Sequence, residues 1–154
     1  MFFFKEGKNP RDGTPLNPLN TEYLLRTLEI SFKQIQYQKK ICKKVEDILR
    51  GIVIPNLASE HDVVRSCACS VIANFCSLEM TDRSIYAEIL PLVCQSMQNK
   101  NLPVRVNAVM ALNTLIEAPE IKEAMVGDLH IILTSILKLM NEIDLDHLVK
   151  ALKE

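Results

Sequence analysis

Two stretches of the chain carry the same pattern of residues, and this repeat constrains the fold more than any other feature of the sequence. Residues 64–75 and 104–115 both read Val-Arg-x-x-Ala-x-x-(Val/Ala)-(Ile/Leu)-x-x-(Phe/Leu), which places Arg65 and Arg105 40 residues apart. Within each copy the apolar positions follow the 3.6-residue period of a helix. The two copies are therefore expected to be equivalent helices in successive structural units.

A proline precedes each copy, at Pro55 and at Pro91, within another apolar helical stretch. Each unit is therefore expected to hold two helices, and a period near 40 residues built from helix pairs is typical of HEAT-type solenoids. One pair cannot bury its apolar face alone, so neighbouring pairs stack and share a continuous core. We expect an all-α fold, an α-α superhelix of the armadillo/HEAT type with about three repeats.

The apolar pattern also divides the chain into segments. We expect a loop at 1–20 that follows a truncated helix, the second helix of a preceding repeat at 21–38, repeats at 40–78 and 82–117, and an incomplete repeat at 128–154. Asn20 or Thr21 is the predicted N-cap of the helix at 21–38. Neither end shows the polar outer face of a capping repeat, so we expect the chain to be part of a longer superhelix.

Several positions recur between the copies and are expected to have structural roles: Pro55, Arg65, Ala68, Pro91, Arg105 and Ala108. The prolines are predicted to bend the first helices, and the alanines to let helices approach closely. Arg65 and Arg105 are predicted to bond carbonyls or loop side chains of the neighbouring unit, as a ladder along the solenoid. Each copy also has a predicted buried stripe, namely Val64, Val71, Ile72 and Phe75 in the first and Val104, Ala111, Leu112 and Leu115 in the second.

Composition restricts the classes of function. The chain has four glycines in 154 residues, which leaves little material for phosphate-binding loops or tight β-hairpins. It contains no GxGxxG, GxxxxGK[ST], HExxH or paired CxxC motif, so we expect no enzyme activity and no cofactor. No apolar run approaches the roughly 18 residues of a membrane span, and neither a membrane nor a small-molecule substrate is an expected partner.

The five cysteines suit a reducing compartment, because an odd number in apolar helical context does not fit a disulfide framework. A competing hypothesis is a metal or redox site built from Cys67, Cys69, Cys76 and His61. Residues two apart on a helix diverge by about 200°, so we expect core thiols and no metal site. Residues 39–44 hold a cluster of lysines without interleaved aromatic residues, so nucleic acid is not an expected partner.

Two helices carry a more particular likeness. Pro55 leads into an Arg-Ser-Cys-Ala-Cys helix that ends in Phe75, and residues 103–112 read Pro-Val-Arg-Val-Asn-Ala-Val-Met-Ala-Leu. Both stretches resemble central HEAT repeats of the importin-β (karyopherin-β) superfamily, nearest its importin seven/eight branch. The resemblance covers roughly residues 23–154 and is weaker upstream of Glu22, where a proline-rich insertion displaces the expected Asp-Gly pair.

This resemblance implies a nuclear transport receptor that binds cargo proteins, Ran-GTP and nucleoporin repeats and shuttles between cytoplasm and nucleus. In that family the second helix of each unit lies on the concave side. The polar residues of those helices are therefore the candidate partner contacts: Arg26, Lys33, Ser66, Ser70, Asn74, Asn107, Asn113 and Thr114. Two alternatives stay open, a HEAT scaffold such as a phosphatase regulatory subunit or vesicle-coat adaptor, and an exportin of the cellular-apoptosis-susceptibility type.

Overall fold

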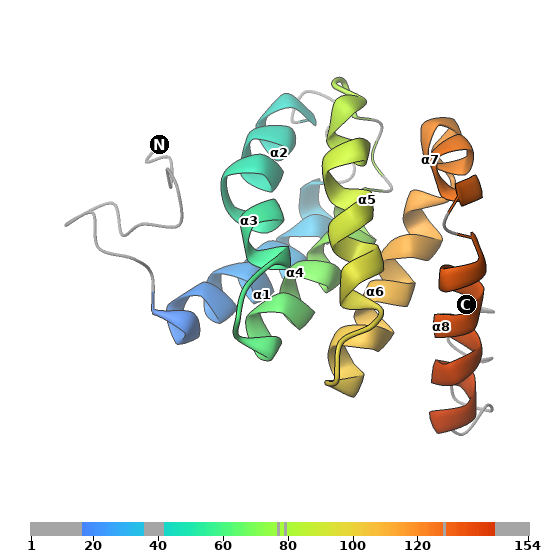
Figure 1. The fold of residues 1–154 in the computed structure, drawn as a ribbon. Coiled ribbons are helices and arrows are strands. Elements are labelled where there is room, and N and C mark those ends of the chain that lie inside the picture. Colours follow the sequence, from blue (N-terminus) through green and yellow to red (C-terminus); the bar gives the residue numbers. More distant parts are fainter. Residues whose placement is uncertain (1–16, 36–41, 77, 79, 128, 144–154) are drawn as a thin grey trace.

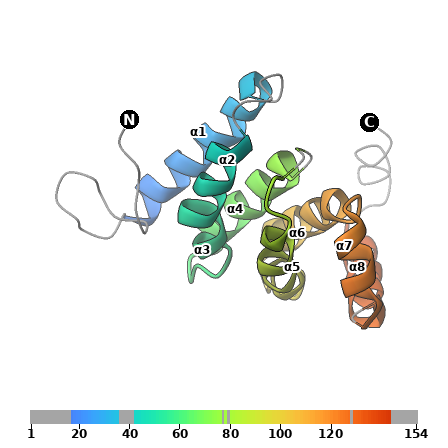
Figure 2. The same ribbon diagram turned by 90° about the horizontal axis from the view of Figure 1, so that it is seen from above.

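The computed structural model of the protein describes residues 17–35, 42–76, 78, 80–127 and 129–143. Every regular element within these ranges is helical, which confirms the predicted all-α class. The helices stack in two layers along the chain (Figure 1). Turning the molecule by 90° shows the same two layers from above (Figure 2).

One layer, called the A layer here, contains the first helix of each unit. It consists of α2 (Cys42–Ile48) with its continuation through a π-helical turn (Leu49–Val53) and α3 (Ile54–Leu57), then α5 (Ser84–Ser96) and α8 (Leu129–Glu142). The second, or B, layer consists of α1 (Pro18–Ile35), α4 (Asp62–Phe75) and α6 (Leu102–Leu115). A short α7 (Pro119–Ala124) and a 3₁₀ turn (Met125–Gly127) lead from α6 to α8.

Helices pack both within and between the layers. Within a unit α3 packs on α4, and α5 packs on α6. Between units, α4 lies along α1 on one side and along α6 on the other, and these are the most extensive helix contacts in the molecule. Pairs of helices that stack side by side in this way are the architecture of a HEAT-type solenoid, as the repeat predicts.

The π-helical turn has a local cause in Pro55, which lies at the start of α3 and has no N–H to bond to the preceding turn. The N–H of Ile54 reaches the carbonyl of Leu49, five residues back. Asn56 then donates its side-chain N–H to the carbonyl oxygen of Ile52 at 2.7 Å. The π-helical hydrogen bond and the Asn56 side chain thus supply donors to two backbone carbonyls near the proline, and the helix continues past Pro55.

The first helix begins earlier than the sequence indicates, and the predicted N-cap is wrong. α1 starts at Pro18, and the side-chain oxygen of Asn17 accepts a hydrogen bond from the N–H of Leu19 at 3.1 Å. Pro18 suits the first helical position because its missing N–H would have no partner there. The predicted loop before Asn17, the predicted helix end after residue 35 and the predicted second helix after residue 143 lie outside the described residues.

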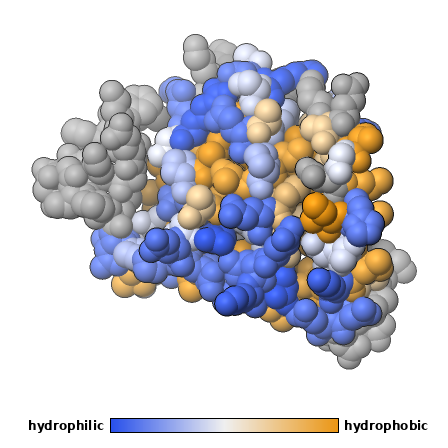
Figure 3. All heavy atoms as spheres, in the orientation of Figure 1, coloured by the Kyte–Doolittle hydropathy of each residue, from blue (hydrophilic) through white to orange (hydrophobic). Residues whose placement is uncertain are grey.

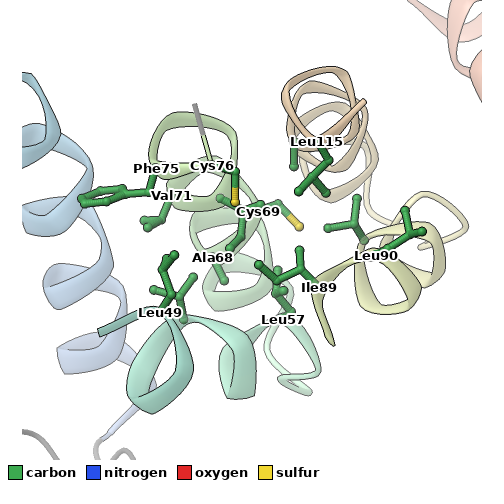
Figure 4. Close-up of a cluster of buried hydrophobic side chains, with 14 of the residues drawn as sticks. Leu49, Leu57, Ala68, Cys69, Val71, Phe75, Cys76, Ile89, Leu90 and Leu115 are labelled. Carbon is green, nitrogen blue, oxygen red and sulfur yellow. The ribbon is translucent and has the colours of Figure 1, made fainter. Parts of the chain in front are cut away.

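The core is continuous from α1 to α8. All eight predicted stripe residues of α4 and α6 are buried, which confirms that part of the prediction. α4 lies at the centre of the close-up view, with side chains from the π-helical turn, α3, α5 and α6 around it (Figure 4). Phe75 points away from these toward α1, where its ring centroid lies 5.1 Å from that of Phe32.

The outer face of the A layer is mainly hydrophilic, with apolar side chains gathered toward α7 and α8 (Figure 3). Two large apolar side chains of this end of the chain, Val126 just before α8 and Leu137 within it, are 74% and 60% exposed. Among the described helices, none combines the length and the apolar character needed to cross a bilayer.

Candidate partner-binding surface

Four of the eight polar candidates on the B layer join one helix to the next: Ser66, Ser70, Asn107 and Thr114. Asn107 of α6 donates to the carbonyl oxygen of Ser66 at 3.2 Å and to its hydroxyl oxygen at 2.9 Å. Two helical turns further along α6, the Thr114 hydroxyl donates to the carbonyl oxygen of Ala73 at 2.9 Å. Each of these bonds spans 41 residues, so it connects equivalent sites of neighbouring units.

The same kind of contact joins α4 to α1. The Ser70 hydroxyl donates to a carboxylate oxygen of Glu29 at 2.7 Å, again across 41 residues. Asn74 donates to the carbonyl oxygen of Ser70 within α4. The ladder between units thus runs through serine, asparagine and threonine side chains of the B layer.

Asn107 gives the ladder its clearest test. Asn107→Ala is expected to lower the free energy of unfolding by about 1–2 kcal/mol, because it leaves the part-buried Ser66 oxygens without this donor. Asn113→Ala on the exposed face of the same helix is the matched control, with an expected change within about 0.5 kcal/mol. Urea denaturation followed by circular dichroism measures both. Equal losses in the two variants would contradict the role given to Asn107.

Two further candidates lie on the open surface. Arg26 is exposed and donates from Nε to the Glu22 carboxylate one turn earlier at 2.8 Å, a hydrogen bond that raises the pKa of the guanidinium. Asn113 is also exposed. The side chain of Lys33 lies outside the described residues. Arg26 and Asn113 are thus the described candidates most open to a partner.

The two repeat arginines do not form the predicted ladder between units. Arg65 donates from two nitrogens to the carbonyl oxygen of Ser59, at 3.0 and 2.5 Å, within its own unit. Arg105 likewise donates to the carbonyl oxygens of Asn99 and Lys100. Side chains near a helix start lean back toward the preceding loop, so each arginine holds the turn between its own two helices. Arg105 also pairs with Glu142 of α8, which does lie in the next unit.

The A layer is joined by charged groups instead. Arg50 pairs with Asp82 at 2.9 Å and with Glu88 at 3.0 Å, and it also bonds the Ser84 hydroxyl at 2.9 Å. Hydrogen bonds from Ser84, together with Arg50, hold the pKa of Asp82 below its ordinary value.

A buried carboxylate lies next to this network. Glu46 of α2 is only 5% exposed. It accepts hydrogen bonds from the backbone N–H groups of Thr81 and Asp82, just before α5. Sequence analysis missed this residue, although it lies between Val45 and Leu49 on the apolar side of its helix.

The cysteines of α4 and its end are buried thiols. Burial raises the pKa of Cys69 to about 11 and that of Cys76 to about 12. Cys67 is also buried, and its pKa is raised for the same reason. These thiols are therefore protonated at neutral pH and pack as small apolar side chains. Within the described residues, no group of three or more His, Cys, Asp or Glu side chains is placed to hold a metal ion.

Comparison with known proteins finds relatives with importin names. A "Probable importin-7 homolog" of Dictyostelium discoideum is 29% identical over 148 residues, which cover 95% of this chain and 13% of that protein. An "Importin beta-like SAD2 homolog" of Arabidopsis thaliana is 29% identical over 110 residues, 71% of this chain and 11% of that protein. Over most of its length the chain is thus similar to importin-β-like proteins. No family model and no solved structure matches it.

The similarity to the Dictyostelium relative covers nearly all the described helices, including both repeat copies. This chain spans about an eighth of the length of the Dictyostelium relative. Side chains that join neighbouring units in the described part of the chain include Ser66, Ser70, Asn107, Thr114, Arg50, Glu46 and Arg105.

Proposed function

We propose that this chain is a HEAT-repeat segment of a nuclear transport receptor that binds cargo proteins and Ran-GTP. The observation that supports the proposal is the similarity to an importin homolog across 95% of the chain. The stacked helix pairs agree with it, since such pairs build the extended surfaces with which solenoids bind other proteins. The receptor would shuttle between cytoplasm and nucleus through weak contacts with nucleoporin repeats.

The geometry suits release as well as capture. Each unit contacts only its neighbours, so small changes at successive junctions add up along a solenoid. Binding of Ran-GTP at one region can thereby alter the curvature that cargo requires at another. On this segment, Arg26 and Asn113 are the proposed contacts for a partner, because both are exposed on the B layer.

The proposal predicts a nucleotide-dependent interaction of the full-length protein that contains this segment. In a pull-down, Ran locked in its GTP state should retain this protein at least about tenfold better than Ran-GDP. A factor of this size is typical when one bound ligand, here the nucleotide on Ran, changes the affinity for another. Quantitative blotting of the bound fraction provides the measurement. No retention on Ran-GTP, or equal retention on both forms, would contradict a transport function and favour a HEAT scaffold.

A further inference from the structure

A groove of about 520 Å³ lies where α8 meets the turn between α5 and α6. Its volume falls in the range of sites that hold small ligands or short peptide segments. Met97 and Ile131 supply apolar lining, and Arg105, Lys138, Glu142 and polar groups supply the rest. The groove is distinct from the ladder of the B layer.

The charged groups of this groove leave an excess of positive charge. Arg105 and Glu142 form an ion pair with each other, so their charges compensate. Lys138 is exposed and lines the same groove. In the described part of the chain, no carboxylate pairs with Lys138. An anionic group that enters the groove would therefore find an ammonium group that no carboxylate of the described residues neutralises.

Other groups in the groove suit a peptide backbone. The hydroxyls of Thr134 and Ser135 donate to carbonyl oxygens one turn back in α8, each at 2.8 Å. Their oxygens keep lone pairs that can accept hydrogen bonds from N–H groups. The side chain of His130 lies on the same side of α8 and adds a further hydrogen-bonding group.

The equivalent junction earlier in the chain is filled by internal contacts. There Asn99 bridges to Asp62 at 3.1 Å, and α5 packs directly on α3. Arg65 at that junction bonds its own loop, without an ion pair to the next helix among the described residues. The repeat would predict the same contacts at α8, but there a groove lies where the earlier junction is filled.

We propose that this groove binds a short acidic peptide segment of a partner protein. A carboxylate of the peptide pairs with Lys138, an adjacent apolar side chain packs on Ile131, and backbone N–H groups bond the hydroxyls of Thr134 and Ser135. Charge complementarity is the basis for this occupant. The proposal does not depend on cargo transport or on Ran.

Fluorescence anisotropy of the 154-residue chain tests it, with a fluorescein-labelled peptide Glu-Asp-Leu-Glu-Asp-Leu as the probe. Lys138→Glu is expected to raise the Kd at least about tenfold. Lys44→Glu on α2 is the matched control, because that lysine is also exposed and the change in net charge is the same. It should leave the Kd within about twofold. Circular dichroism establishes that both variants are folded.

Three outcomes would overturn the proposal. One is the absence of peptide binding to the unmodified chain. Another is an equal loss of affinity in the Lys44 and Lys138 variants, which would indicate general charge attraction. The last is complete displacement of the peptide by inorganic phosphate with the same dependence on Lys138, which would indicate a simple anion site.

Discussion

Phe75→Ala is expected to lower the free energy of unfolding by about 3–5 kcal/mol. The side chain is 1% exposed and packs between α4 and α1, against Phe32. Its removal leaves a cavity at the junction of two units, beside Phe32 (Figure 4 shows Phe75 pointing toward α1). Because domains of this size are stable by only about 5–15 kcal/mol, the variant should lose a large part of its stability.

Guanidinium chloride denaturation, followed by circular dichroism at the helical band, measures this effect. Ile30→Ala on α1 is the matched control, since Ile30 is 73% exposed and its truncation opens no cavity. Its expected change is within about 0.5 kcal/mol. If the Phe75 variant were as stable as the Ile30 variant, the packing of α4 against α1 would not be a main source of stability.

Glu46→Ala should cost about 2–3 kcal/mol, because it removes a charged acceptor from two backbone N–H groups. Those groups belong to Thr81 and Asp82, at the entrance to α5. With Glu46 only 5% exposed, water cannot readily replace the carboxylate. The effect should therefore be felt at the junction between α2 and α5 and not at the B layer.

Two further variants separate the hydrogen bonds from the charge. Glu46→Gln keeps a side-chain oxygen as acceptor, so a smaller loss of about 1 kcal/mol is expected. Asp47→Ala removes a carboxylate from an exposed neighbour and should change stability by less than about 0.5 kcal/mol. Thermal denaturation of all three compares them directly. A Glu46→Ala loss no larger than that of Asp47→Ala would contradict the capping role.

The fold follows closely from the sequence because the repeat carries two independent signals. The apolar stripes of residues 64–75 and 104–115 have helical period, and every predicted member is buried. Recurrence at 40 residues adds the information that these helices occupy equivalent places. Periodicity alone would predict helices without saying which ones stack.

The side-chain contacts between units were less predictable than the helices. They depend on which neighbouring groups a side chain meets, and the period of the apolar residues does not give this. Ser66 and Asn107 look like ordinary polar surface positions, yet they meet across 41 residues. Arg65 recurs as a stacking residue would, but it bonds the carbonyl of Ser59 in its own turn. Sequence spacing places such residues on a helix face, and only the packing of whole helices decides which neighbour they meet.

The connection after α6 was missed for a different reason. α7 has six residues, too few for a periodic apolar pattern to be recognised. The groove next to α8 depends in turn on where this connection leaves α8, so the sequence could not indicate it. From the sequence, Lys138 and Glu142 are two charged residues on one helix, and nothing in the pattern predicts that they line a common groove.

The unequal joints of the two layers should respond differently to dissolved salt. Between α2–α3 and α5, Arg50 makes ion pairs on partly exposed side chains, and such pairs in water contribute about 0–1 kcal/mol each. Between α4 and α6, part-buried hydrogen bonds and the most extensive helix contact of the molecule hold the units together. Dissolved salt should therefore weaken the Arg50 contacts of the A layer, and it should leave the buried hydrogen bonds of Glu46 and of the B layer largely unchanged.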